Sequence, residues 1–323
     1  MRNLIQFSVI FFSLFTLQVQ ATAITDSTKQ FETKVLGHID LMNTHTAKLM
    51  NLSCDTQKDK LVKNWKISYS HYLAISYMDL EVITKNSLNY SFSFWPDKKN
   101  LIAQKMRLLL SAADFTDAYI DNSSAPVKGY QAIEYLLFDD SQKQINCQAL
   151  KAITQNMLNN ITLITSQIDQ FRIIKAEFLT TQREIEGASI AFNQISNHLS
   201  AIIKKVESIT NDKIHEKLYF SDAWRSKQAL YFHKHNVNHA IKYIQIMSVL
   251  LSKQNQKILQ TQITKLNKQL TQLPNNYFDI YTQNKETLLF KHLATLKKLS
   301  KTLSNVILAD LSITLGFNNS DGD

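Results

Sequence analysis

Turn-forming residues are scarce in this chain, with only five glycines and three prolines among 323 residues. Because glycine and proline mark the turns between short strands, their scarcity disfavours a turn-rich all-β architecture and favours long helices. Of the residues, 44% are hydrophobic and 20% are charged, which allows a substantial buried core and argues against disorder. The length suffices for two modest domains or one large one.

Apolar residues recur at three- and four-residue steps along most of the chain, which is the spacing of one face of an α-helix. We predict an all-α fold of two up-and-down helical bundles packed together. Gly187 is the predicted break between an N-terminal bundle, residues 24–186, and a C-terminal bundle, residues 187–323. Helices are expected over residues 25–51, 56–85, 97–120, 147–185, 190–209, 222–272 and 277–314, and after the loop at residues 121–129.

The first 23 residues have the pattern of a secretory signal peptide. Arg2 is followed by an apolar stretch and then by small residues, which offer cleavage sites after Ala21 and after Ala23. No cysteine follows either site, so the pattern is not that of a lipoprotein. Nothing later in the chain approaches the roughly 18 continuous apolar residues of a membrane span. We expect a periplasmic or secreted protein that is soluble once the signal peptide is removed.

The formal net charge of +9 suits contact with an anionic surface or ligand. However, the lysines are scattered rather than gathered in a run, as is typical of solubilising charge on helix faces. The sequence contains no nucleic-acid-binding motif, so nucleic acid is not an expected partner. A structural module that binds an anionic polymer of the cell envelope remains one alternative.

Cys54 and Cys147 are the two cysteines of the chain. An oxidising compartment would allow them to form a disulfide that joins two helix starts across a long loop. Such a bridge would stabilise the fold by ~3–5 kcal/mol. Two free thiols are the alternative.

The stretch GYQAIEYLLF begins at Gly129 and predicts a helix that is buried on nearly all sides. Gly129 allows a turn or a close backbone approach just before the helix. Gln131 and Glu134 are three residues apart and lie on neighbouring positions of one face. A buried glutamate needs a cation or several hydrogen-bond donors, because burying it unpaired is costly. Alternatively, Glu134 lies at the edge of the core and reaches solvent or a lysine.

Two further stretches have unusual composition. FWPDKKN places Trp95, Pro96 and Asp97 at a helix start. LGFNNSDGD ends the sequence with Asp321 and Asp323, and its apolar residues predict that this tail is held against the fold. The two aspartates are expected to cap a helix or form salt bridges, with metal binding as the alternative.

SDAWRSKQAL is another stretch of unusual composition. It places Trp224, Arg225 and Ser226 at the start of a helix in the second half of the chain. The first N–H groups of a helix have no partner within it, and a guanidinium is a strong donor to carboxylates. This segment therefore predicts a site for an anion or a carboxylate.

Taken together, and in their order along the chain, the four segments resemble the imelysin family of exported bacterial proteins. The peptidase designation of that family is less secure than its link to iron uptake. The resemblance covers a G-x-H-x-x-E signature at Gly129 to Glu134, the W-P-D and W-R-S helix starts, and the LGFN…DGD terminus. It implies two helical bundles with the signature near a cleft between them, in a periplasmic or cell-surface setting. Other envelope proteins of iron uptake are then possible partners.

The chain departs from that signature at Gln131, which stands where the family has histidine. An imidazole nitrogen is a good ligand for iron or zinc, whereas a glutamine amide offers a weak neutral oxygen. Glu134 is then the one metal ligand left in the motif, and a catalytic zinc normally has three protein ligands. No H-E-x-x-H motif is present. The motif therefore disfavours a metallopeptidase.

Other residues could replace the missing histidine. HKHNVNH supplies His235 and His239, which are four residues apart on a helix and could share a metal ion, while His233 points elsewhere. A solvated polar face is the alternative for these histidines. Further candidates to approach Glu134 in a bundle are His71, Asp79, Glu81, Asp114 and Asp117. A site rich in carboxylates would favour ferric iron or calcium over zinc.

The leading hypothesis is an exported binding protein of metal uptake, with iron as the expected ion and without catalysis. Its ligand cleft would involve Gln131, Glu134, Arg225 and Ser226. Alternatively, Gln131 and Glu134 hydrogen-bond Arg225 or Ser226 and tie the two halves of the chain together. A peptidase with metal held by other histidines is the competing enzyme hypothesis.

Overall fold

The computed structural model describes residues 2–54, 57–78, 83, 87–167, 181–210 and 220–315, with side chains from residue 22 onward except at 181–184. Within these ranges all regular structure is helical, as predicted. The longer helices are α1 (Arg2–Asn51), α2 (Lys58–Ile75), α5 (Leu101–Ala112), α7 (Gly129–Phe138), α8 (Cys147–Ser166), α9 (Thr181–Thr210), α10 (Ala229–Ser248), α11 (Lys253–Gln272) and α13 (Glu286–Leu311). The shorter ones are α4 (Leu88–Phe92), α6 (Asp117–Asn122), η1 (Ala125–Val127) and α12 (Tyr277–Thr282).

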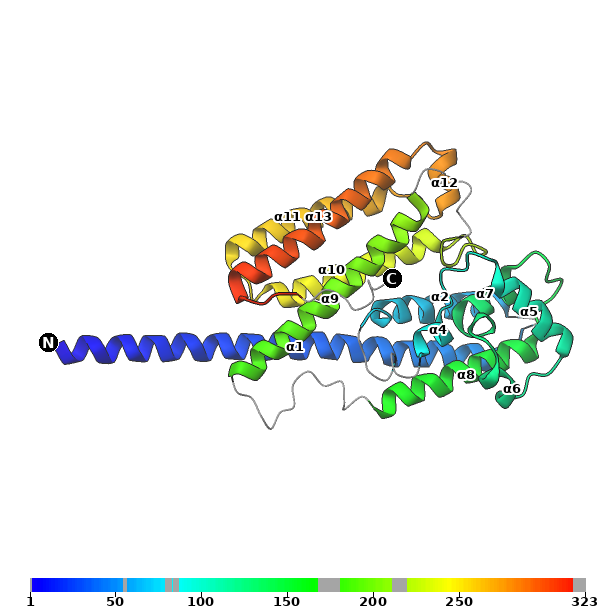
Figure 1. Ribbon diagram of the computed structural model, residues 1–323, viewed down its shortest axis with the longest axis horizontal. Helices are drawn as coiled ribbons and strands as arrows, with labels where there is room; N and C mark the ends of the chain where they lie inside the picture. The colour runs from blue at the N-terminus through cyan, green and yellow to red at the C-terminus, as the bar shows by residue number, and fades with distance from the viewer. Residues whose placement is uncertain are drawn as a thin grey trace.

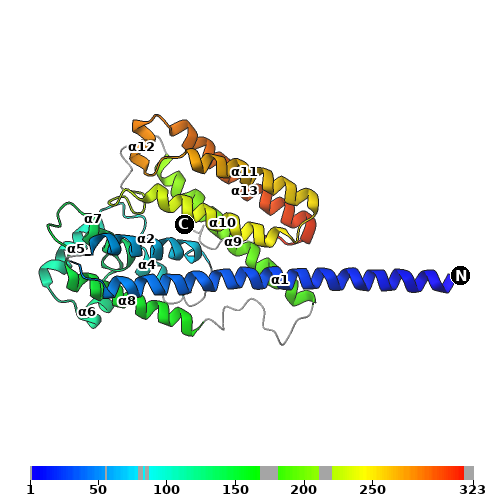
Figure 2. The ribbon, with the colours of Figure 1, turned by 180° about the vertical axis from the view of Figure 1, so that it is seen from behind.

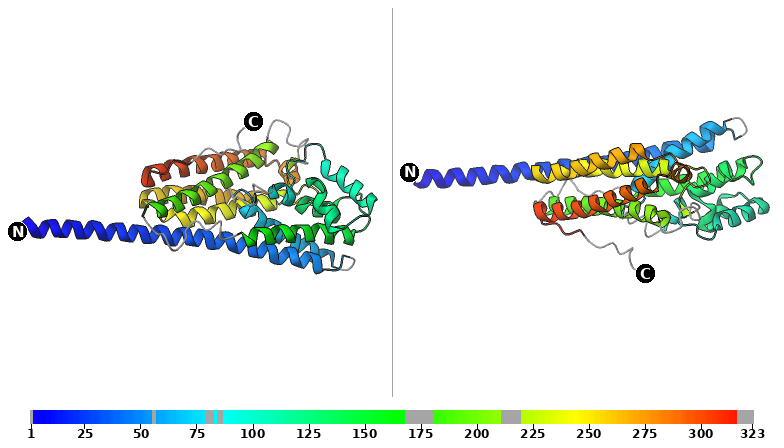
Figure 3. Two further views of the ribbon diagram at one scale, coloured as in Figure 1. Left: turned by 60° about the horizontal axis from the view of Figure 1, so that its bottom comes forward. Right: turned by 90° about the horizontal axis from the view of Figure 1, so that it is seen from above.

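Helix α1 is the long rod on which the rest of the molecule is assembled (Figure 1). Its C-terminal part packs against α2 and α8, and it also contacts α9 and α10 from the second half of the chain. Helices α11 and α13 form an antiparallel pair that α9 and α10 connect to α1 (Figures 2 and 3). The first turns of α1 project beyond all the other helices (Figure 2). No helix among the described residues is long and apolar enough to cross a membrane.

Several helix boundaries differ from those predicted. Helix α8 ends at Ser166, the helix expected to begin at 190 already runs from Thr181, and Gly187 lies inside it. The prediction of a break at Gly187 is therefore wrong. The helix continues through this residue because one glycine costs only about 1 kcal/mol in a helix. The domain boundary there stays a prediction.

The helix predicted over residues 222–272 is also divided, at residues 249–252. Ser252 caps α11 by accepting a hydrogen bond from the Asn255 N–H, and its own N–H donates to Asp310 at 2.7 Å. Periodicity misses this corner because the apolar spacing continues through it, whereas the cap and a carboxylate from α13 decide the chain direction.

The predicted disulfide is confirmed. Cys54 follows α1, Cys147 is the first residue of α8, and their Cα atoms lie 5.7 Å apart. The bridge spans 93 residues of sequence and fixes the end of α1 against the start of α8.

Candidate functional site

The motif helix α7 begins with its backbone in contact with α4. Gly129 has φ +71°, a left-handed conformation that residues with a Cβ rarely adopt. A Cβ built on Gly129 would lie 2.1 Å from the backbone carbonyl oxygen of Phe92. Glycine is therefore required here by both conformation and space, which confirms the expected close approach at this residue.

Glu134 lies on the inner face of α7 and is only 1% exposed. One of its carboxylate oxygens accepts two hydrogen bonds from Ser226, from the backbone N–H and from the hydroxyl, each 2.7 Å long. The other oxygen has no hydrogen-bond partner among the described residues. Burial raises the pKa of the Glu134 carboxyl from 4.5 to about 7, although the two bonds from Ser226 act in the opposite direction.

Gln131 begins a second chain of contacts from the same helix face. Its amide donates to the Tyr69 hydroxyl at 2.8 Å, and that hydroxyl donates to Asp222 at 3.0 Å. Asp222 also pairs with Lys205 of α9. Burial lowers the pKa of Lys205, but Asp222 and Tyr77 together raise it above its usual value, so the ammonium stays charged. We call the six residues Tyr69, Gln131, Glu134, Lys205, Asp222 and Ser226 the junction.

Arg225 lies beside the junction and is held by the first half of the chain. Its Nε donates to an Asp139 carboxylate oxygen at 3.0 Å and its Nη2 to the Asn100 side-chain oxygen at 2.7 Å. The guanidinium also stacks on Trp224, 4.5 Å from the ring centroid. These residues lie in a turn, because α10 begins only at Ala229. The predicted carboxylate-binding segment thus receives two carboxylates of its own chain, those of Glu134 and Asp139.

The W-P-D segment approaches the same turn. Trp95 donates from its indole to the carbonyl of Phe220 at 2.7 Å, while Asp97 accepts hydrogen bonds from the N–H groups of Leu101 and Ile102. Asp97 therefore satisfies the first N–H groups of α5. The helix begins at Leu101, so the prediction that Trp95, Pro96 and Asp97 form its start is wrong by about one turn. Pro96 is exposed.

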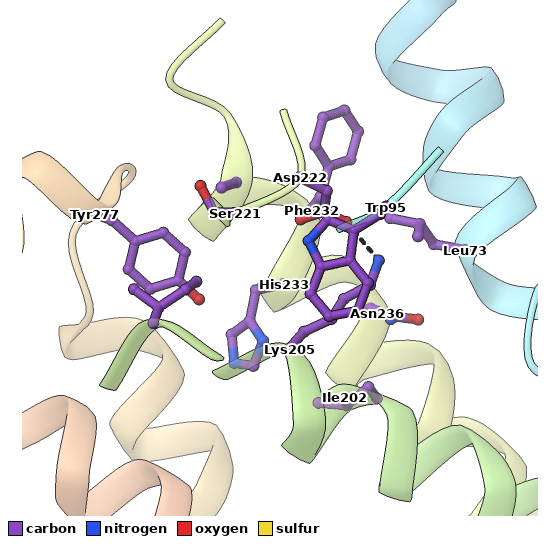
Figure 4. Close-up of a pocket in the computed structure, with 12 residues that line it drawn as sticks. Leu73, Trp95, Ile202, Lys205, Ser221, Asp222, Phe232, His233, Asn236 and Tyr277 are labelled. Atoms are coloured by element: carbon purple, nitrogen blue, oxygen red, sulfur yellow. Dashed lines mark hydrogen bonds and ion pairs between the residues drawn. The ribbon is translucent and has the colours of Figure 1, made fainter. Parts of the chain in front are cut away.

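The space at the junction is small. A cavity of about 10 Å³ lies next to Asp222 and Lys205 (Figure 4). That volume holds about one water molecule. Trp95, His233, Asn236 and Tyr277 are among its other lining residues. Gln131 and Glu134 do not line this cavity. They are buried, and their hydrogen bonds go to Tyr69 and Ser226.

The candidate histidines separate into different environments. His235 is half-buried and packs on Tyr231, with ring centroids 4.3 Å apart, whereas His239 turns toward His38 of α1 and His71 of α2. His233 is buried and lies 2.7 Å from a ring nitrogen of His292. The structure therefore does not pair His235 with His239, and it places His71 in a histidine cluster.

Other predicted site residues have different outcomes. Asp114 and Asp117 are exposed, and Asp114 binds Thr116 of its own loop. Asp79, Glu81, Asp321 and Asp323 lie outside the described residues. Tyr69, Asp222, Lys205 and His38 were not predicted, because their partners come from distant helices and no local spacing marks them.

A family model confirms the resemblance inferred from the four segments. The model described as Imelysin (Peptidase M75) matches residues 22–303, most of the chain. This chain belongs to the imelysin family. A comparison with curated proteins found no matching sequence.

Two solved structures share the imelysin fold of this chain. An imelysin-like protein from Psychrobacter arcticus 273-4 has a TM-score of 0.71 and 15% identity, over 93% of this chain and 98% of the other. A "putative iron-regulated protein A precursor" from Parabacteroides distasonis ATCC 8503 has a TM-score of 0.64 and 13% identity, over 90% of this chain and 95% of the other. At these identities the likeness concerns the fold alone.

Within this imelysin, the glutamine at the signature position is engaged in the fold rather than free. The Gln131 amide nitrogen is committed to Tyr69, and its oxygen has no hydrogen-bond partner within the described part of the chain. The ligand-binding role predicted for Gln131, Glu134, Arg225 and Ser226 remains a prediction, whereas their hydrogen bonds tie the two halves together.

Proposed function

We propose that this imelysin-family protein is an exported, non-catalytic metal-binding protein of bacterial iron acquisition. The predicted signal peptide and the Cys54–Cys147 disulfide support export. The family membership and the neighbour named for iron regulation support an iron-related role. Other envelope proteins of iron uptake are the partners that this role implies.

One observation carries the non-catalytic part of the proposal: the motif carboxylate is buried, and one of its oxygens already accepts two hydrogen bonds. A general base or metal ligand must reach substrate or metal, yet Glu134 is 1% exposed and receives two donors from Ser226. Gln131 offers no imidazole, and the cavity of about 10 Å³ beside Asp222 and Lys205 has no room for a peptide. We infer that the signature segment of this chain serves as an internal tie between its halves.

The proposal is tested on purified mature protein without added chelators. We expect it to bind ferrous iron under anaerobic conditions and to leave unstructured casein intact, with or without added zinc. Casein cleavage that a chelator stops and Glu134→Gln abolishes would contradict the proposal and establish the peptidase. If no metal is retained and the protein instead binds an anionic envelope polymer in a salt-sensitive way, the structural-module alternative holds.

The tie role predicts a specific pH dependence of stability. Because the folded-state pKa of Glu134 is raised to about 7, its stabilising contribution is complete below pH 4.5 and is lost as pH rises through 7. Between these pH values the free energy of unfolding of the wild-type protein should therefore fall by on the order of 2–3 kcal/mol relative to that of Glu134→Gln. Urea titrations of both proteins at several pH values measure the difference. Parallel pH profiles would show that Glu134 is not the titrating group.

A further inference from the structure

Three histidines from distant parts of the sequence meet beside α1. His38 of α1, His71 of α2 and His239 of α10 each offer a ring nitrogen, and these nitrogens lie within 4.8 Å of one another. The Nδ1 atoms of His38 and His71 are 2.8 Å apart, and the rings of His38 and His239 stand edge to face with centroids 4.6 Å apart. We call this group the histidine cluster.

The buried ring nitrogens of the histidine cluster have few hydrogen-bond partners. His38 and His239 are 3% and 8% exposed. Among the described residues, neither ring nitrogen of His239 has a hydrogen-bond partner, nor does Nε2 of His38. Leaving a buried polar group unpaired costs about 1–3 kcal/mol, and an apolar side chain at either position would avoid that cost. A bound group that accepts the free lone pairs of these nitrogens would remove the cost of burying them unpaired.

The histidine cluster is accessible, in contrast to the junction. It borders a groove of about 710 Å³ between α1 and α10, which all three histidines line. Lys29, Lys34 and Lys242 also line it, together with Asp26 and the apolar Leu41 and Ile246. An ion can thus reach His38, His71 and His239 without opening the helical core.

We propose that His38, His71 and His239 bind one divalent transition-metal ion, with its fourth coordination position open to the groove. This inference rests on the proposed metal-binding function and assigns that function a site. Three imidazoles plus one exchangeable ligand are the donor set of an open tetrahedral site, with metal–nitrogen distances of about 2.0–2.1 Å. Ligands on such an ion lie about 3.4 Å apart. That value exceeds the 2.8 Å between the Nδ1 atoms of His38 and His71 and is below the 4.8 Å within which all three ligand nitrogens lie.

The donor set also limits which ion binds. Imidazole nitrogens suit ferrous iron, cobalt and zinc, whereas ferric iron and calcium favour oxygen ligands. Burial is the main reason that the pKa of His38 is lowered, and the nearby His71, Lys34 and Lys242 lower it further. These lysines oppose a bare cation but favour an anion as the fourth ligand. The groove therefore fits a metal ion that carries a small anion or a carboxylate.

Cobalt(II) titration followed by visible absorbance tests the site, because the ion reports tetrahedral nitrogen coordination by its colour. Wild-type protein should bind one ion, and His239→Ala should weaken binding at least tenfold. His235→Ala is the matched control, since His235 lies one turn away on the same helix but outside the cluster; its affinity should equal that of the wild type. Equal loss in both variants, or in neither, would overturn the proposal.

Two further measurements keep the result independent of folding. His71→Ala changes the least buried of the three ligands and should also weaken binding at least tenfold, with the circular dichroism spectrum and melting temperature retained. Azide should shift the spectrum of the cobalt protein, and more weakly in Lys242→Gln. A spectrum that azide never changes would contradict an open position. If the wild type and the histidine variants bind metal equally well, the site at the histidine cluster is wrong but the proposed function still holds. If the wild type binds no metal, both the site and the proposed function are wrong.

Discussion

Replacing Gly129 with alanine should destabilise the protein by about 3–5 kcal/mol or prevent folding. The left-handed backbone at φ +71° is strained for any residue with a Cβ, and the added methyl would overlap the Phe92 carbonyl carbon and oxygen. These are backbone atoms of α4, so no side-chain rotation relieves the clash. Urea denaturation followed by circular dichroism measures the loss.

Gly37→Ala is the matched control, because Gly37 lies within α1 and a Cβ there meets nothing within 4 Å. Alanine in a helix interior is favoured over glycine, so this variant should gain about 0.5–1 kcal/mol. Equal stability of the two variants would show that the approach of α7 to α4 is looser than described.

Removal of the disulfide should have an effect of similar size. The free energy of unfolding of the Cys54→Ser, Cys147→Ser double variant should be about 4 kcal/mol lower than that of the wild type. The reason is that the bridge closes a loop of 93 residues in the unfolded chain. The denaturation midpoint in urea measures this difference. Dithiothreitol should lower the midpoint of the wild type to that of the double variant and leave the variant unchanged. A wild-type midpoint indifferent to the reductant would contradict a stabilising bridge.

Much of the fold follows from local sequence. The start of α7 at Gly129 and the disulfide were both predicted, because each depends on a residue type with one dominant conformational or chemical preference. The corners at residues 249–252 and 283–285 were missed, because apolar spacing passes through them unchanged.

The junction was predictable only in part. Burial of Glu134 among apolar residues required donors, and Ser226 was one of the partners considered. Tyr69 was not predicted as a site residue, yet its hydroxyl joins Gln131 to Asp222. Contacts of this kind depend on which helices become neighbours, and one sequence does not determine that choice.

The histidine cluster shows the same limit more sharply. His235 and His239 were considered together because they share a helix face, but His239 meets His38, which lies 201 positions earlier, and His71. A metal site assembled from three helices leaves no motif in the sequence. The family signature therefore indicated the correct relatives, whereas the proposed metal site lies elsewhere in the structure.

The central claim is that metal binding in this imelysin does not depend on its signature motif. The most direct test measures the ferrous iron bound per chain under anaerobic conditions. The wild type, Glu134→Gln and His239→Ala are measured in parallel. We predict one ion for the wild type and for Glu134→Gln, and none for His239→Ala at the same free iron concentration. Loss of iron in Glu134→Gln, with His239→Ala unaffected, would contradict this claim and return the metal to the motif.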